Sequence, residues 1–225
     1  MMGGVEFAAD CATARPGLFV AGEDAGGVHG ADRLGGNGVA NSTVFGGIAG
    51  ETMAAWVRKE GALRDPDRAE IEAAHERCEL PMRRKAAAHG GLEALRERLY
   101  ETMWEKAGII RNAAGLQSAR ADLRAIDAEL DAHTLADSNR AFNLSWHDWM
   151  NLKSLVEVGR VIASAALSRS DSRGAHFRDD FPESGPLDPS AYTSVRMKGG
   201  ALDISMKPVV FTRVSPGETL LRDAA

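Results

Sequence analysis

The sequence predicts a mainly α-helical protein with minor β structure, in which part of an α/β domain is followed by an antiparallel three-helix bundle and a C-terminal β-hairpin. Three long stretches carry apolar residues at the spacing of amphipathic helices. Residues 192–197 and 202–206 alternate around a glycine pair, which is typical of a hairpin. Near the N-terminus, a short apolar run leads through a glycine-dense loop into a small-residue helix, the order found in cofactor-binding α/β units.

The N-terminal element centres on residues 16–50. Its apolar run, residues 18–21, is bounded by Gly17 and Gly22, and this pattern predicts a buried strand that ends in a tight turn. Glu23 stands at the exit of that strand, where open α/β sheets place their ligand contacts. We therefore expect Glu23 to lie at a binding site.

The loop that follows is long and rich in glycine, and it carries His29 and Arg33. An apolar helix is expected over about 39–59, and residues 5–7 are a further candidate for a short strand. Glycines let a backbone approach a ligand closely, and a helix N-terminus offers free N–H groups to negative charge. The stretch predicts a cofactor or anion pocket. The alternative is a plain connector, which fits poorly with a loop of this length.

The connector and the bundle follow in order. Asp65 before Pro66 predicts a helix start, and Pro81 should stop or kink that charge-rich, solvated helix. The basic cluster 83–85 is predicted to be a solvated face, with an acidic partner as the alternative. Short loops join the three helices of the bundle, which makes neighbours antiparallel. Their apolar stripes are Leu92, Leu95, Leu99 and Met103; Leu116, Ala119, Leu123, Ile126 and Leu130; and Leu152, Leu155, Val156, Gly159, Ile162, Ala163 and Ala166.

Composition narrows the function classes. A net charge of −5 gives no bulk attraction to nucleic acid. The two cysteines, Cys11 and Cys78, have no metal-binding spacing, so we predict no metal site. No apolar run reaches the roughly 18 residues of a membrane span. We expect a cytoplasmic protein, held at a membrane surface only through a partner.

Two motifs in the same order resemble the flavoprotein subunits of succinate dehydrogenase and fumarate reductase, a family that includes L-aspartate oxidase. The first comprises residues 17–23 (GLFVAGE), 29–37 (HGADRLGGN) and 44–46 (VFG). The second, residues 172–182 (SRGAHFRDDFP), lies far downstream. The resemblance implies the C-terminal part of an FAD-binding α/β domain over residues 1–61, charged connector helices over 62–91, a three-helix bundle over 92–168, and a loop, hairpin and tail over 169–225.

The resemblance also implies roles for residues of the first motif. Arg33 matches the catalytic arginine that clamps a substrate carboxylate, and Glu23 matches a glutamate that hydrogen-bonds the FAD. Gly38 and Val39 match positions whose backbone N–H groups meet the flavin. The alternatives are an Arg33 ion pair with Asp32, where the family usually has asparagine, and a Glu23 that merely caps the glycine loop.

Four further residues are weaker candidates. His29 falls near the flavin ring in the resemblance, although a loop histidine bonded to backbone is the plainer interpretation. Arg173, His176 and Arg178 belong to the second motif, and we expect them to brace the fold, with direct cofactor contact as the alternative.

The family's enzymes begin with a GxGxxG turn and add a capping domain that supplies a catalytic arginine, and this sequence has neither. The resemblance therefore implies the C-terminal portion of an FAD-dependent oxidoreductase acting on a small carboxylic acid. We expect the chain alone to be inactive and to bind FAD weakly. One rival is a non-catalytic module that docks onto an iron–sulfur or flavin-carrying partner; within the family, the rival is L-aspartate oxidase.

Overall fold

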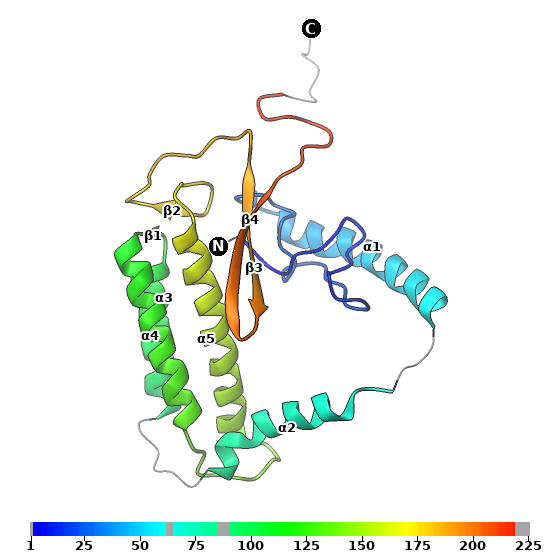
Figure 1. The fold of residues 1–225 in the computed structure, drawn as a ribbon. Coiled ribbons are helices and arrows are strands. Elements are labelled where there is room, and N and C mark those ends of the chain that lie inside the picture. Colours follow the sequence, from blue (N-terminus) through cyan, green and yellow to red (C-terminus); the bar gives the residue numbers. More distant parts are fainter. Residues whose placement is uncertain (1, 62–64, 85–90, 219–225) are drawn as a thin grey trace. The chain divides into compact units, whose positions relative to one another are not determined.

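The structure is a computed structural model that describes residues 2–61, 65–84 and 91–218 (Figure 1). These residues form five helices and two small two-stranded sheets, which confirms the predicted fold class. The helices are α1 (Asn37–Glu60), α2 (Arg68–Arg83), α3 (Leu92–Ala107), α4 (Ala113–Ala132) and α5 (Leu144–Ser168), and the strands are β1 (Ile110–Arg111), β2 (Phe177–Arg178), β3 (Ala191–Lys198) and β4 (Ala201–Pro208).

The chain divides into two compact units. The first contains Met1–Ile71 and Arg173–His176, and the second contains Glu72–Ser172 and Phe177–Ala225. The four-part division expected from the sequence is finer than this and stays a prediction. Residues 62–64 and 85–90 of the predicted connector, and residues 219–225 of the predicted tail, lie outside the described residues.

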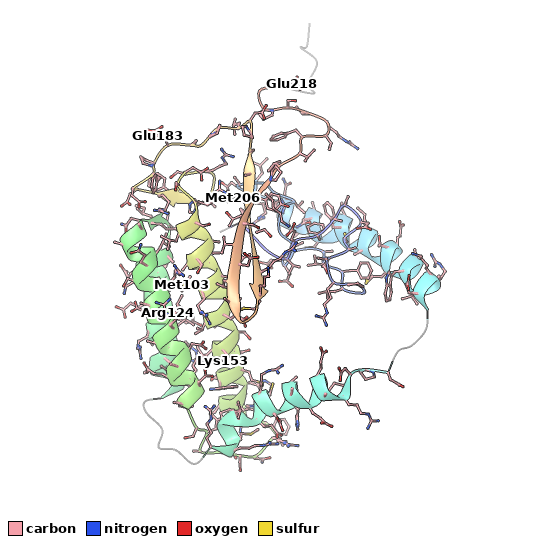
Figure 2. All side chains as sticks on the ribbon, viewed as in Figure 1. Met103, Arg124, Lys153, Glu183, Met206 and Glu218 are labelled. Atoms are coloured by element: carbon pink, nitrogen blue, oxygen red, sulfur yellow. The ribbon has the colours of Figure 1, made fainter. Side chains whose placement is uncertain are left out.

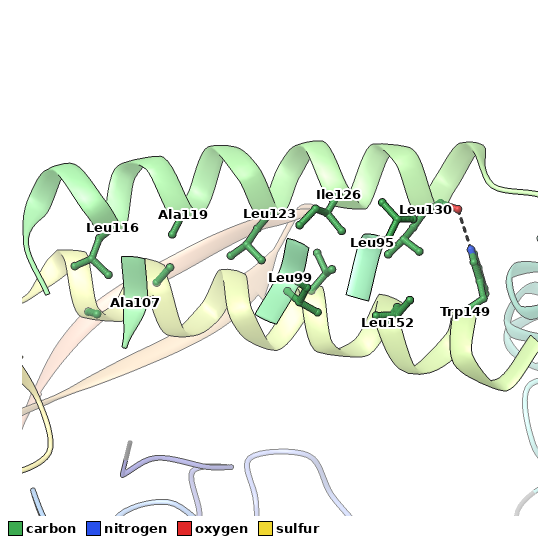
Figure 3. Packing of buried hydrophobic residues seen from close by; sticks show 13 residues of the cluster. Leu95, Leu99, Ala107, Leu116, Ala119, Leu123, Ile126, Leu130, Trp149 and Leu152 are labelled. Carbon is green, nitrogen blue, oxygen red and sulfur yellow. Dashed lines mark hydrogen bonds between the residues drawn. The ribbon is translucent and has the colours of Figure 1, made fainter. Parts of the chain in front are cut away.

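The core of the second unit lies between α3, α4 and α5, where the three predicted apolar stripes face one another (Figure 3). Leu155 of the third stripe is an exception, because it is 43% exposed. Leu123 is fully buried there, and the indole Nε1 of Trp149 donates to the carbonyl of Leu130 at 2.8 Å. Gly159 lets the helices approach closely, since a Cβ at this position would lie 3.3 Å from a methyl of Leu123. Lys153 of α5 (Figure 2) adds ion pairs to Asp127 and Asp131 of α4.

Asparagine caps begin both long helices of the bundle. The side chain of Asn112 accepts from the N–H of Gly115 at 2.8 Å, and that of Asn143 accepts from Trp146 at 2.9 Å. Each cap satisfies an N–H group that has no partner within its own helix. Local sequence therefore sets where α4 and α5 start.

The hairpin forms where the alternation predicted it. Gly199 and Gly200 both have positive φ, at 57° and 80°, as the tight turn between antiparallel strands requires. The strands pair from Ala191 opposite Pro208 to Lys198 opposite Ala201. β4 ends at Pro208.

The connector helix starts later than predicted and is less solvated. Asp67, rather than Asp65, caps α2 by accepting from Ala69 N–H at 2.9 Å, and Pro81 is accommodated near the end of the helix. Glu79 is only 2% exposed. Other residues of the second unit therefore cover the side of α2 that carries Glu79, which the sequence assigned to solvent.

Three basic side chains surround Glu79. The carboxylate pairs with Arg83, with Arg140 and, at 3.1 Å, with His75. Burial raises the pKa of Glu79, but the Arg83 hydrogen bond and the neighbouring charges outweigh it and lower this pKa below its ordinary value. Arg83 of the predicted basic cluster is thus paired, while Lys85 lies outside the described residues.

Arg178 anchors the second motif within the second unit. It is 1% exposed, makes two 2.6 Å hydrogen bonds to Asp180, and donates to the carbonyls of Ala166 and Arg169 at the C-terminal end of α5. Asp180 also accepts from the N–H of Ala113, the first residue of α4, at 2.8 Å. The Arg178 hydrogen bond, opposed by burial and aided by that N–H group, lowers the pKa of Asp180 to about 2.

Candidate cofactor and anion site

The first unit begins with loops that pair through single bridges instead of extended strands. The predicted buried strand over residues 18–21 is wrong: Phe19 makes one bridge, to Ala12, and Leu18 is 51% exposed. Residues 5–7 likewise contribute only isolated bridges. A buried strand needs neighbours along both edges, and the described part of this unit supplies none of that length.

The tight turn predicted after this run is present. Gly22 has φ of 93° and its carbonyl accepts from the N–H of Ala25 at 3.1 Å. Glu23, at the same turn, is exposed, and its carboxylate makes no hydrogen bond or ion pair to any residue that the structure describes. No such bond supports the alternative role of Glu23 as a cap of the glycine loop. An exposed carboxylate can accept hydrogen bonds from hydroxyl groups.

The start of α1 offers backbone donors. Gly36, with φ of 85°, turns the chain into the helix, and no side chain caps it. The first turn also contains no acidic residue. The N–H groups of Gly38 and Val39 therefore lack an intrahelical partner, and the positive end of the helix dipole has no fixed counter-charge on α1 itself.

Arg33 lies against this helix start. A Cβ atom built on Gly38 would stand 2.8 Å from Nη1 of Arg33, so the guanidinium occupies the space beside that glycine. Asp32 accepts from the backbone N–H of Arg33 at 2.9 Å, and within the described residues the guanidinium forms no ion pair with Asp32 or with any other acid. An unpaired cation beside an uncapped helix N-terminus is a site for an anion.

Asn41, a residue that the sequence interpretation missed, connects α1 to the glycine loop. Its side chain is nearly buried, and Nδ2 lies 3.2 Å from the carbonyl of Gly22 and 3.3 Å from Nε2 of His29. Its Oδ1 has no hydrogen-bond partner among the described residues. The available signal was an amide four residues after Asn37, hence on the same face of the helix start.

Part of the second motif joins the first unit. The N–H of Ala175 donates to the carbonyl of Ala31 at 3.1 Å, and Gly174, with φ of 55°, passes so close that a Cβ there would lie 2.2 Å from that oxygen. Arg173 and His176 flank this contact and pair through their backbones at 2.7 Å. Residues 173–176 thus brace the loop just before Arg33, while Arg178 lies in the second unit.

Two negative findings apply to the described ranges only. They contain no group of histidine, cysteine, aspartate and glutamate side chains arranged to hold a metal ion. Among the helices described, none is both long enough and apolar enough to cross a membrane.

Two family models match this chain. Residues 96–220 match the model described as "Fumarate reductase flavoprotein C-term", and residues 1–39 match the model described as "FAD binding domain". The first match covers more than half of the chain and includes most of the helical bundle and the whole hairpin.

Curated relatives agree with these models. The chain is 33% identical to a fumarate reductase flavoprotein subunit of Mycobacterium tuberculosis, over 97% of this chain and 38% of that protein. It is 36% identical to an uncharacterised FAD-dependent oxidoreductase of Methanocaldococcus jannaschii, over 81% of this chain and 32% of that protein. The chain therefore spans about a third of the length of the curated relatives it matches.

Solved structures show the same relationship. Sdh1 of Mycobacterium smegmatis in complex with UQ1 superposes on 91% of this chain with a TM-score of 0.81 and 34% sequence identity, and the match covers 34% of that chain. A quinol-fumarate reductase with menaquinol molecules gives a TM-score of 0.84 over 95% of this chain, at 26% identity, and the match covers 37% of that chain.

Proposed function

This chain belongs to the family of fumarate reductase and succinate dehydrogenase flavoproteins, and from that premise we propose that it is the C-terminal portion of an FAD-dependent oxidoreductase that acts on a small carboxylic acid. It contributes part of the flavin site and one arginine that holds a substrate carboxylate. The observation that carries the proposal is the unpaired guanidinium of Arg33 beside the uncapped start of α1.

The residues at this start suit FAD, which the family uses. The N–H groups of Gly38 and Val39 would donate to carbonyl oxygens on the pyrimidine edge of the flavin, and Glu23 would accept from hydroxyls of the cofactor. Once bound, the cofactor supplies the hydride chemistry. The positive end of α1 favours negative charge on any group held there.

Arg33 suits the substrate. Its planar fork binds a carboxylate through two parallel hydrogen bonds and stays charged at every physiological pH. A fixed cation beside a carboxylate also stabilises negative charge that develops on the neighbouring carbons. Fumarate, succinate and, as in L-aspartate oxidase, aspartate are the acids to test.

The exposed apolar residues of α1 support the proposal that a further part of the protein covers this helix. Its nearly buried residues are Asn41 and Ala49, whereas Val39, Val44 and Val57 are exposed. An apolar helix normally buries such residues against a sheet or other helices. The remainder of the flavin-binding fold would cover them, either as an earlier part of the same polypeptide or as a separate chain. The isolated chain would then be inactive.

A second candidate function is a non-catalytic module that docks onto an iron–sulfur or flavin-carrying partner. The outer face of α3 favours it, because Trp104 is 75% exposed and Tyr100 lies half exposed beside it. With Glu97, Glu101 and Glu105 they line a shallow hollow, and in the described structure these carboxylates form no ion pair. Exposed aromatic residues of this kind mark interaction surfaces.

A fusion protein distinguishes between the two proposed functions. The N-terminal two-thirds of the M. tuberculosis relative is joined to this chain and compared with the chain alone and with the intact relative. We expect flavin absorbance to stay with the fusion through gel filtration, and the fusion to oxidise a reduced viologen dye when fumarate is added. The chain alone should retain little or no flavin. A folded fusion without flavin would contradict the proposed function and favour the docking module.

A further inference from the structure

The contacts of Asn41 decide how its amide is oriented. Its Nδ2 lies 3.2 Å from the backbone oxygen of Gly22, which can only accept a hydrogen bond. Turning the amide over would place two acceptors against each other around a side chain that is 6% exposed. The amide therefore presents its NH₂ group to Gly22, and the second hydrogen of the same group is directed to His29.

The orientation of the amide in turn selects the tautomer of His29. Nε2 of the imidazole lies 3.3 Å from Nδ2 of Asn41, and it must accept because the amide nitrogen has only hydrogens to offer. In a neutral imidazole, an accepting Nε2 leaves the proton on Nδ1. This tautomer is the less favoured one for a free histidine in water.

The selected tautomer leaves a donor without an acceptor. The ring of His29 is partly exposed, and Asn41 is its hydrogen-bonding partner in the part of the chain that the structure describes. Its Nδ1–H is therefore available to a ligand. His29 lies on the loop between the turn at Gly22 and Arg33, the two positions that bracket the candidate site.

We infer that Asn41 is a positioning residue that holds His29 as its Nδ1–H tautomer, so that His29 gives a neutral hydrogen bond to an oxygen of the bound ligand. The oxygen is a carbonyl or a carboxylate, supplied by the flavin or by the acid substrate. The identity of that ligand rests on the proposed function. The tautomer does not, because it follows from the contacts among Gly22, His29 and Asn41.

Nitrogen NMR of the 225-residue chain labelled with ¹⁵N-histidine tests the tautomer without cofactor or substrate. The spectrum is recorded about one to two pH units above the ordinary histidine pKa of about 6.5, and His29→Gln identifies the signals of His29. We expect an unprotonated Nε2 and a protonated Nδ1. Asn41→Ala should shift the ring toward the Nε2–H form, and Asn41→Asp, whose carboxylate accepts, should shift it further.

Thr43→Ala is the matched control, since Thr43 is exposed on the same helix and its hydroxyl, within the described residues, donates only to the carbonyl of Val39 at 2.9 Å. It should leave the His29 signals unchanged. A protonated Nε2 in the wild-type chain would overturn the inference, and this result needs no Asn41 variant to fold. A change in Thr43→Ala equal to that in Asn41→Ala would also overturn it.

Two additions to the fusion protein, labelled in the same way and freed of its flavin, then identify the ligand, because the chain alone is expected to bind little flavin. Excess succinate supplies the carboxylate, and excess FMN supplies the flavin ring. A shift of the Nδ1 signal with succinate assigns the donor to the substrate, and a shift with FMN assigns it to the flavin. The absence of a shift with both would overturn the donor role of His29 and leave the tautomer selected by Asn41 standing. Failure of the proposed function alone would leave the tautomer result unchanged.

Discussion

Arg33 packs against Gly38 so closely that a Cβ atom at residue 38 would lie only 2.8 Å from Nη1 of the guanidinium. Glycine therefore makes room for a cation at the start of α1. A helix dipole disfavours a cation at this end by itself, so negative charge on the ligands proposed for this site would stabilise the arrangement.

Gly38→Ala should disturb the contact between Arg33 and residue 38 without unfolding the protein. Gly38 does not have positive φ, and the atom in the way is the end of a flexible side chain, so alanine is tolerated. Its helix propensity raises the free energy of unfolding by at most about 1 kcal/mol. The displaced guanidinium should raise the KM of the fusion protein for fumarate several-fold. The control is Gly46→Ala, since a Cβ at Gly46 meets nothing within 4 Å. An unchanged KM in Gly38→Ala would contradict the placement of Arg33.

Arg33→Ala should reduce kcat/KM of the fusion protein severely. Loss of a buried charge-assisted contact is worth about 2–5 kcal/mol, which corresponds to roughly a thirty-fold to several-thousand-fold loss of rate. Arg33→Lys should recover only part, because a point charge does not reproduce the fork. Steady-state kinetics with fumarate, succinate and aspartate measure this, with flavin content determined for each variant. Near-wild-type turnover at full flavin content would remove Arg33 from the substrate site.

Asp32→Asn tests whether the neighbouring acid restrains Arg33. The amide oxygen can keep the hydrogen bond that Asp32 now accepts from the backbone N–H of Arg33, so the loop should stay folded. Removal of one negative charge beside the site should lower the KM for dicarboxylates, and the effect should weaken with added salt. A higher KM would show that the carboxylate of Asp32 helps the site instead.

Asp180 should make the second unit sensitive to acid. Its pKa is about 2 in the folded chain, chiefly because of the Arg178 hydrogen bond, and about 3.9 when unfolded. The folded state thus binds fewer protons, so this contribution to stability is complete above about pH 5 and is lost as the pH falls toward about 2. Urea denaturation from neutral pH to about pH 3 should show the loss.

Asp180→Asn isolates that contribution from those of other carboxylates. It should lower the denaturation midpoint at neutral pH, because buried Arg178 loses its counter-charge, and the gap to wild type should narrow as the pH falls. Asp179→Asn is the control, since among the residues that the structure describes its carboxylate has only a long contact of 3.4 Å, to Asn112. A gap that is independent of pH would contradict the assignment to the ion pair.

The bundle should fold without the N-terminal site. Its continuous core, from Leu95 to Ala166, lies entirely within residues 92–168. Far-UV circular dichroism of that segment should show a cooperative thermal transition. Leu123→Ala should destabilise it by about 2–5 kcal/mol, because Leu123 is fully buried, whereas Leu155→Ala, at a half-exposed position of α5, should cost much less. A broad, non-cooperative melt would show that the segment needs the rest of the chain.

The sequence by itself determined the elements whose cause is local. The stripe from Leu116 to Leu130 repeats with the helical period, so it predicts α4 whatever surrounds it. The hairpin is also predicted locally, because the backbone angles of its turn depend on Gly199 and Gly200. The family resemblance was also readable, because its two motifs are long and occur in order.

Only the tertiary structure decided what depends on residues that are distant along the chain. The apolar run at residues 18–21 is not a buried strand, because burial requires neighbouring strands that no local pattern reveals. Glu79 forms an ion pair with Arg140, which lies beyond α4 in the sequence. Asn41 meets His29 and Gly22 because the helix start and the glycine loop fold onto each other. A hydrophobic period repeats along one segment, so the sequence of that segment is enough to reveal it. A hydrogen bond between two segments depends on how the fold places both of them, and neither segment reveals it alone.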